Sequence, residues 1–233
     1  RRATMVAIED AATSLVLEHG FDAVTVDEIC AAADISKRTF FNYVASKEAA
    51  VIGTTPEDVP ADARAEFLDR ADPDVPRALL ALFLSAFADA RTADDAQTAV
   101  LLQRRRSIFC DHPDLAAARM TASSRFQLRL VDTLTDHFEK HPSLRRLTGV
   151  PVEAEARACV ALVAASTNLG LSTWLTRESA TFADLGDECA VARAGLALGV
   201  VGRSREAGGA LDGGRAVDGD RHVGDAGGIP VRA

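Results

Sequence analysis

The sequence is poor in aromatic residues and cysteine, and it has no excess of positive charge. Phe, Trp and Tyr together make up 5% of its 233 residues, whereas hydrophobic residues reach 48% and charged residues 26%. This composition excludes wholesale disorder and the collagen-like and disulfide-dense classes. The net charge of −8 excludes a generally basic surface, so any nucleic-acid-binding function requires a local patch.

The four cysteines, Cys30, Cys110, Cys159 and Cys189, form no C-x-x-C pair. Scattered single cysteines are typical of small buried residues in a reducing compartment, so we expect a cytoplasmic protein. The uncharged stretch 158–176 reaches the length of a membrane span. Its Ser, Thr and Asn residues instead favour a buried interface helix, and we expect no contact with a membrane.

The familiar signatures of catalysis are also missing. There is no P-loop, no G-x-S-x-G, no nucleotide-binding glycine motif and no H-E-x-x-H, so we expect neither an enzyme nor a cofactor. His137 and His141 have a metal-ligand spacing, but Phe138 stands where a zinc-protease motif has Glu. We interpret this pair as an exposed helix end and expect no metal.

Residues 3–53 carry dense helix signals. Apolar residues recur at helical spacing up to Gly20, where the first helix is expected to stop. Thr25 and Glu28 form a capping box that starts a short second helix. Ser36 and Ser46 are placed to cap two further short helices.

Two short helices that are joined by a tight turn make a helix-turn-helix, in which the second helix enters the major groove of DNA. Asp34 occupies the turn, and Asp tolerates the left-handed conformation. Phe40 and Val44 are expected to pack inward. The residues expected to face outward from the second helix are Lys37, Arg38, Thr39, Phe41 and Asn42.

Residues 8–52 resemble the DNA-binding module of the TetR family of transcriptional regulators. The resemblance is carried by Gly20-Phe21, Thr25-Val26, Ser36-Lys37, Thr39-Phe40-Phe41 and the closing Tyr43…Ser46-Lys47-Glu48. Asp34 replaces a glycine common in the family's turn, and Val44 replaces a common aromatic residue. The resemblance implies that DNA is contacted by Thr25, Lys37, Arg38, Thr39, Phe41, Tyr43 and Lys47.

The resemblance also implies a homodimer with an all-helical C-terminal domain that binds a small effector. Four prolines between residues 56 and 76 mark a domain boundary. Beyond it, the pattern predicts helices over about 61–70, 77–91, 94–110, 113–140, 152–177 and 183–201. The candidate lining of an effector pocket is Phe83, Phe87, Arg105, Phe109, Phe126 and Trp174.

The last two helices are apolar over most of their circumference, and we expect them to form the dimer interface. Gly195 and Gly199 would permit close helix approach there, and Leu171 would lie centrally. Residues 202–233 hold nine of the sixteen glycines and almost no large apolar residue, so we expect a disordered tail.

Together these signals predict an all-α fold with an N-terminal three-helix helix-turn-helix domain (1–53) and a C-terminal helical bundle domain (54–201). The predicted function is a regulator, a repressor released from palindromic double-stranded operator DNA by a small-molecule effector, whose identity the sequence does not give. Two alternatives remain open at this point: a DNA-binding regulator without an effector, and a helical enzyme with an inert helix-turn-helix-like corner.

Overall fold

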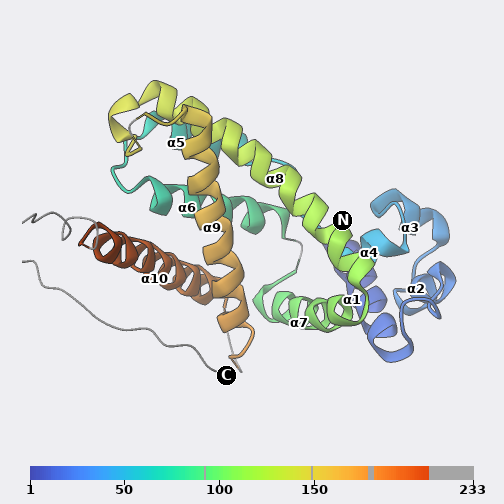
Figure 1. The fold of residues 1–233 in the computed structure, drawn as a ribbon. Helices are drawn as coiled ribbons and strands as arrows, with labels where there is room; N and C mark the ends of the chain where they lie inside the picture. The colour runs from blue at the N-terminus through green and yellow to red at the C-terminus, as the bar shows by residue number, and fades with distance from the viewer. Residues whose placement is uncertain (92, 148, 178–180, 210–233) are drawn as a thin grey trace, which may run out of the picture. The chain divides into compact units, whose positions relative to one another are not determined.

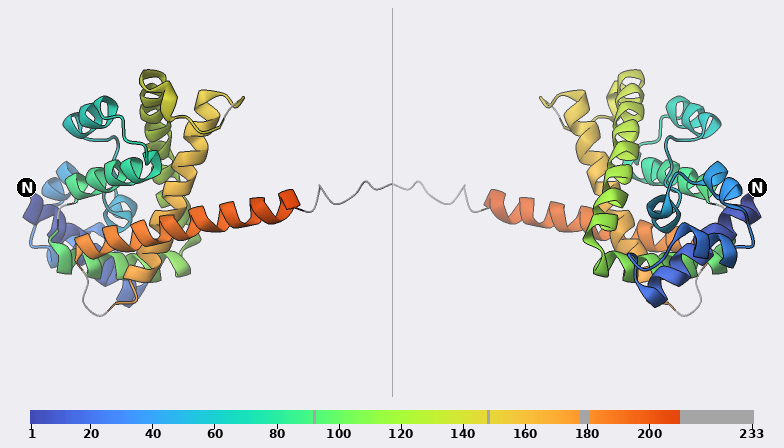
Figure 2. Two further views of the ribbon diagram at one scale, coloured as in Figure 1. Left: turned by 90° about the vertical axis from the view of Figure 1, so that its left-hand side faces the viewer. Right: turned by 90° about the vertical axis from the view of Figure 1, so that its right-hand side faces the viewer.

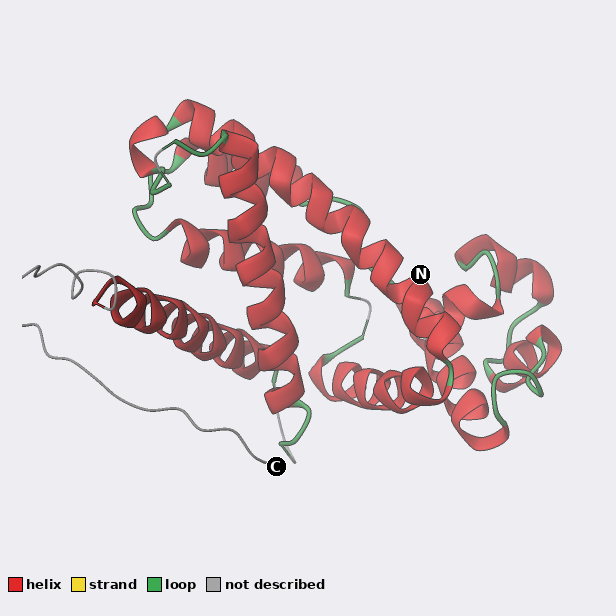
Figure 3. Ribbon diagram, in the orientation of Figure 1, coloured by secondary structure: helices red, strands yellow, loops and turns green. Residues whose placement is uncertain are grey.

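The structure is a computed structural model that describes residues 1–91, 93–147, 149–177 and 181–209. Within these ranges the secondary structure is helical, without strands (Figure 3), which confirms the all-α prediction. The chain divides into two units, Arg1–Leu196 and Ala197–Ala233. The last helix extends to Gly209, so residues 202–209 of the expected tail are helical, and 210–233 lie outside the described residues.

The first four helices cover the range predicted for the N-terminal domain, with one helix more than the three predicted (Figure 1). Each of the three short helices begins after a Thr or Ser whose hydroxyl accepts a hydrogen bond from the backbone amide three residues later. Such caps satisfy amides that otherwise lack a partner at a helix start. The helices are α1 (Arg2–His19), α2 (Val26–Ala32), α3 (Lys37–Tyr43) and α4 (Lys47–Ile52).

The helices that follow cover the range predicted for the C-terminal domain and are given that name below. Their bounds agree with the predicted ranges to within about three residues, except that the last helix continues further. They are α5 (Ala61–Asp69), α6 (Val75–Ala90), α7 (Asp95–Asp111), α8 (Pro113–Lys140), the short 3₁₀ helix η1 (Pro142–Leu144), α9 (Val152–Trp174) and α10 (Phe182–Gly209). Helices α8 and α9 pack side by side (Figure 2).

The apolar residues form two clusters. One belongs to α5, α6, α8, α9 and the start of α10. The other lies within α1–α4 but also includes Ile108 of α7 and Leu115 of α8. Helix α1 accordingly packs against α7 and α4 against α8 (Figure 1), so the N-terminal helices share a core with the C-terminal domain.

Helices α9 and α10 approach each other closely at Gly170. A Cβ atom there would lie 2.6 Å from the backbone nitrogen of Cys189, a distance no side chain tolerates. Gly195 by contrast has open space around it, and the surroundings of Gly199 lie outside the described residues. The close approach within the chain therefore occurs at Gly170, which the sequence pattern did not single out.

None of the helices in the described ranges combines the length and the hydropathy that crossing a membrane requires. The stretch 158–176, which the sequence left open to that interpretation, forms most of α9.

Candidate nucleic-acid interface and ligand pocket

The start of α2 is fixed by the predicted capping box. The backbone amide and the hydroxyl of Thr25 each donate to Glu28 Oε2 at 2.8 Å, and the Glu28 amide donates back to Thr25 Oγ1 at 3.3 Å. These bonds favour the ionised carboxylate and lower the pKa of Glu28. Thr25 remains exposed beside the start of the helix.

The turn between α2 and α3 is closed at Asp34, whose φ is +52°. This left-handed conformation lets the Ile35 amide donate to the carbonyl of Cys30 at 3.0 Å. Ser36 then caps α3 by accepting a bond from the Thr39 amide at 3.0 Å. The prediction that Asp34 adopts the left-handed turn is confirmed.

Helix α3 buries one side and exposes the other. Phe40 is fully buried and Val44 nearly so, as predicted, while the Phe41 side chain is 55% exposed and meets Phe40 edge-on at a centroid distance of 5.2 Å. Arg38 is also exposed. Of the predicted DNA-facing residues of α3, Lys37, Arg38 and Phe41 are therefore exposed, whereas Thr39 is half-buried and Tyr43 is half-buried against the core.

The two cations at the start of α3 differ in their surroundings. Lys37 Nζ lies 2.7 Å from Asp27 Oδ1, and both side chains are exposed. Among the described residues, Arg38 has no carboxylate within 4.0 Å. The guanidinium of Arg38 is thus available to an external acceptor, whereas the ammonium of Lys37 shares its charge with Asp27.

Lys47 has a structural role that the sequence did not reveal. Its Nζ donates to the carbonyls of Phe21 and Val24 at 2.7 and 2.8 Å, and it lies 4.0 Å from the centroid of the Phe21 ring. An ammonium has three donors. One donor is therefore left for a phosphate, while two hold the loop between α1 and α2.

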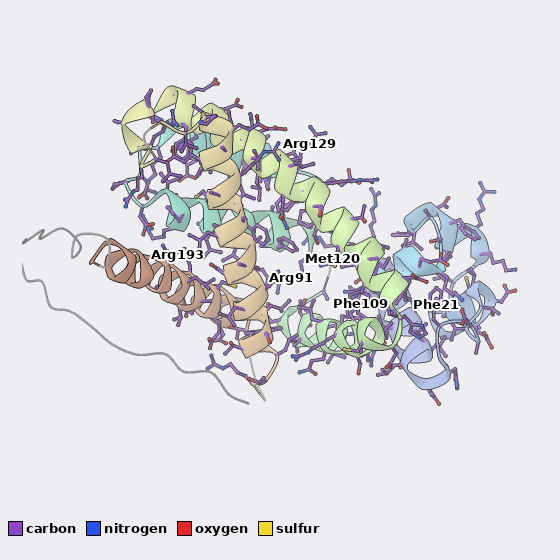
Figure 4. All side chains as sticks on the ribbon, viewed as in Figure 1. Phe21, Arg91, Phe109, Met120, Arg129 and Arg193 are labelled. Carbon is purple, nitrogen blue, oxygen red and sulfur yellow. The ribbon has the colours of Figure 1, made fainter. Side chains whose placement is uncertain are left out.

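A cavity of about 120 Å³ lies in the C-terminal domain, bounded by α6, α7, α8, α9 and α10 and reached by α1. Its apolar wall includes Phe83, Phe87, Leu101, Leu102, Leu171 and Leu185. Its polar residues include Glu9, Thr54, Arg105 and Arg119. Arg91 also lines it, with its guanidinium paired to Asp95 and 4.6 Å from the Phe182 ring centroid (Figure 4).

Three of the six candidate pocket residues, Phe83, Phe87 and Arg105, line this cavity. Phe126 lies behind the two phenylalanines, with its ring centroid 5.5 Å from that of Phe83 and 5.8 Å from that of Phe87. The other two candidates lie elsewhere. Phe109 packs against the core of the N-terminal helices, and Trp174 is buried at the end of α9, where its Nε1 donates to the Thr181 carbonyl.

Arg105 joins the cavity to the N-terminal helices. It is only 8% exposed, its Nε donates to the Val51 carbonyl at 2.9 Å, and its Nη2 lies 3.2 Å from Glu9 Oε2. The guanidinium occupies the space beside Gly53, where any Cβ atom would overlap it. Gly53 has a φ of +77°, so this position needs glycine for its backbone as well.

The structure corrects the expectation that His137 and His141 form an exposed helix end. His137 is 1% exposed, and its ring packs against that of Phe67, tilted by 33°, at a centroid distance of 4.5 Å. Burial lowers the pKa of His137, because the charged imidazolium loses its solvation. Within the described residues, no three His, Cys, Asp or Glu side chains gather as metal ligands. The missed signal is Phe67 on α5, whose contact with α8 does not show in local sequence.

Residues 8–51 match the family model described as "Bacterial regulatory proteins, tetR family". A regulator of Mycobacterium tuberculosis provisionally assigned to mycofactocin biosynthesis, MftR, is 35% identical over 123 residues, which are 52% of this chain and 59% of MftR. An uncharacterised helix-turn-helix regulator of Bacillus subtilis, YdeS, is 47% identical over 49 residues, which are 21% of this chain and 25% of YdeS.

The chain thus aligns with less than two thirds of the length of either curated relative. Among solved structures, GusR of Salmonella enterica has 19% identity and a TM-score of 0.44, with 83% of this chain and 93% of GusR covered. FadR of Thermus thermophilus, a repressor solved with lauroyl-CoA, has 23% identity and a TM-score of 0.41, with 96% and 100% covered. Both likenesses are remote, and the ligand of FadR is a property of that protein.

Proposed function

Because residues 8–51 match the model of the tetR family of bacterial regulatory proteins, we propose that this protein is a transcriptional repressor that a small molecule releases from its operator. The observation that carries the proposal is the matched helix-turn-helix, whose α3 buries Phe40 and exposes Arg38, Thr39 and Phe41 to varying degrees. An Arg can donate two bonds to guanine, and an aromatic ring can contact a thymine methyl group. The seven predicted DNA contacts remain part of this proposal.

The cavity supports the part of the proposal that concerns effector binding. Glu9 of α1 and Thr54, which follows α4, line it together with residues of the C-terminal helices. A ligand there touches the N-terminal helices directly. Such a ligand can favour one placement of α3 over another, and this differential affinity is what release from DNA requires.

An uncharged exposed stripe supports the part of the proposal that concerns dimerisation. Ala158, Ala161, Ala165 and Leu169 follow one side of α9 at helical spacing, and Leu169 is 49% exposed. On α10, Val191 is 69% exposed. Leu171 lines the cavity instead, so Leu169 and Val191 are better sites than Leu171 for testing an interface between two copies.

The test of DNA binding is to sequence the fragments of the protein's own genome that the purified full chain retains. We expect a palindromic site with half-sites about 34–36 Å apart. Arg38→Ala should weaken binding to that site by about 1–3 kcal/mol and relax the preference at one base pair. Arg129→Ala, which removes an exposed arginine on α8, is the matched control and should bind normally.

The proposal fails if wild-type protein retains no discrete site, or if Arg38→Ala binds the recovered site as well as wild type. The dimer is tested separately by light scattering. Val191→Glu should dissociate the dimer and weaken operator binding, because one half-site alone gives too little affinity. If light scattering shows that the wild-type protein is a monomer at micromolar concentration, only the proposed dimer is contradicted.

A further inference from the structure

The cavity has an unequal distribution of charge. Three arginines line it, Arg91, Arg105 and Arg119, but among the described residues Glu9 is its one carboxylate. The charge of Arg91 is neutralised by its ion pair with Asp95. Glu9 is thus left to compensate both Arg105 and Arg119, and the polar end of the cavity carries one uncompensated positive charge.

The hydrogen bonds of Arg105 are also incomplete. Its Nε donates to the Val51 carbonyl, but its buried Nη2 has no hydrogen-bond acceptor in the described part of the chain, although Glu9 Oε2 lies 3.2 Å away. A buried donor without an acceptor costs free energy until a partner arrives. Glu9 itself is engaged elsewhere, because its Oε1 accepts from the amide and the hydroxyl of Thr54, both at 3.3 Å.

Arg119 is held only weakly by its neighbours. Its Nη1 donates to the carbonyls of Ile52 and Thr54 at 3.4 Å and to Thr55 Oγ1 at 3.3 Å, all long for hydrogen bonds. Burial and the positive charge of Arg105 lower the pKa of Arg119 to about 10, so it is still protonated at neutral pH. An anion beside it would relieve both effects.

The rest of the cavity lining is apolar and is therefore suited to an apolar group of a ligand. Away from the arginines it is lined by Phe83 and Phe87 of α6, Leu101 of α7, Leu171 of α9 and Leu185 of α10. The two phenylalanine rings stack at a centroid distance of 4.8 Å. A purely ionic ligand would leave this wall uncovered, and a purely apolar ligand would leave the arginines uncompensated.

We propose that the cavity takes an amphiphilic organic anion, whose anionic group binds Arg105 and Arg119 in competition with Glu9 and whose apolar body lies along Phe83, Phe87 and Leu171. This inference rests on the proposed function, for which it names the effector class. Glu9 belongs to α1 and the carbonyls of Ile52 and Thr54 border α4. The anion therefore takes two arginines away from contacts that hold the N-terminal helices.

The test uses three probes of equal length and different charge: octanoate, 1-octanol and octylamine. Calorimetric titration of the full chain should show octanoate binding at least about tenfold more tightly than 1-octanol, because charge-assisted bonds form only with the carboxylate. Octylamine should bind more weakly than either. Equal affinity for octanoate and 1-octanol, or no binding of octanoate at about 1 mM, overturns the proposal.

Two substitutions make the test specific to this geometry. Glu9→Gln removes the competing carboxylate and keeps the side chain's shape, so it should tighten octanoate binding about tenfold and leave 1-octanol unchanged. Arg119→Gln should weaken octanoate binding by a similar factor. Arg129→Gln, an exposed arginine further along α8 (Figure 4), is the matched control and should change neither.

Each variant is checked by circular dichroism and by its binding to the recovered operator. If Glu9→Gln is folded and binds octanoate more weakly than wild type, the competition between the anion and Glu9 is wrong. Direct titration separates the two levels of the proposal. A protein that binds its operator but not octanoate contradicts this inference alone, whereas a protein without any operator contradicts the proposed function.

Discussion

The N-terminal helices and the C-terminal helices are fixed by contacts of different range along the chain. In α2, α3 and α4 the defining bonds join residues three apart, as in Thr25–Glu28 and Ser36–Thr39. In the C-terminal domain the defining contacts join distant residues, such as Gly170 with Cys189, and Arg105 of α7 pairs with the still more distant Glu9 of α1. The first kind of contact can be predicted from residues close together in the sequence. The second kind is formed only in the folded chain, between residues far apart in the sequence.

This difference says where variation should be tolerated. A short cap can be repaired by another residue that offers a side-chain oxygen, since Ser, Thr, Asp and Asn all cap helices. A contact such as that of Gly53 with Arg105 depends on two distant positions together. The largest effects of substitution should therefore fall on the long-range contacts, including those that tie the two regions to each other.

Gly53 and Gly20 provide the sharpest comparison, since both have a positive φ, +77° and +84°. Gly20→Ala should cost about 1–3 kcal/mol from backbone strain alone, because its Cβ would meet nothing within 4 Å. Gly53→Ala also forces the end of the Arg105 side chain to shift away from Glu9, and weakening this charge-assisted contact adds about 1.5–3 kcal/mol. Urea denaturation of both variants measures the difference. Equal losses would show that the ion pair contributes nothing to stability.

Lys47 is the long-range exception among the N-terminal helices. Lys47→Met should lower the free energy of unfolding by about 1.5–3 kcal/mol, because two charge-assisted bonds to the Phe21 and Val24 carbonyls are lost. Lys37→Met is the control, because an exposed pair like that of Lys37 with Asp27 contributes less than about 1 kcal/mol.

On DNA the same two lysines act together. Each substitution should reduce the salt dependence of operator binding by about one unit, if each ammonium neutralises one phosphate. A Lys47→Met protein as stable as wild type would contradict the structural role of Lys47, whatever its affinity for DNA.

The crossing of α9 and α10 is tested by Gly170→Ala against Gly186→Ala. The new Cβ at position 170 would lie 2.6–2.7 Å from atoms of Cys189, so the helices must separate, at about 1–3 kcal/mol. At position 186 the nearest atom, Leu84 Cδ1, is at an ordinary 3.6 Å, and the better helix propensity of Ala should raise stability by up to about 1 kcal/mol. Thermal unfolding should thus shift in opposite directions.

The smallest expected effect is a dependence on pH centred on His137. Its lowered pKa means that the unfolded chain binds a proton below the ordinary value of 6.5 while the folded protein does not. Stability should therefore fall as pH decreases from 6.5, by up to about 1.4 kcal/mol per pH unit. His137→Gln should flatten this slope, and His19→Gln, at an exposed site, should leave it unchanged. If His137→Gln leaves the slope unchanged, the pH dependence of stability arises from other groups.

The sequence was sufficient for the parts of the fold that local chemistry determines. Capping residues and apolar spacing predicted the helices of the N-terminal domain and the bounds of α5 to α9 closely, because those signals lie within the elements themselves. The left-handed turn at Asp34 was equally local. The full extent of α10 was not predicted, because its glycine-rich end carries few of the apolar residues that mark a helix.

The pocket was harder to predict because it is made of residues from six helices. Phe83, Phe87 and Arg105 were identified by type, as scarce large or charged groups on apolar faces. Glu9 and Arg119 were missed, since nothing in their own neighbourhoods distinguishes them from solvated charges. Lys47 was assigned to DNA alone, since its bonds to the Phe21 and Val24 carbonyls span more than twenty residues.

The contact between Gly53 and Arg105 also has an evolutionary consequence. Neither position can change freely, because a side chain at 53 collides with the guanidinium and loss of the arginine leaves Glu9 buried without its partner. A lineage can leave this arrangement only by shortening residue 105 and neutralising residue 9 before residue 53 gains a side chain. Homologues that keep Arg at 105 should therefore keep Gly at 53 and an acid at 9, and the three positions should be inherited together.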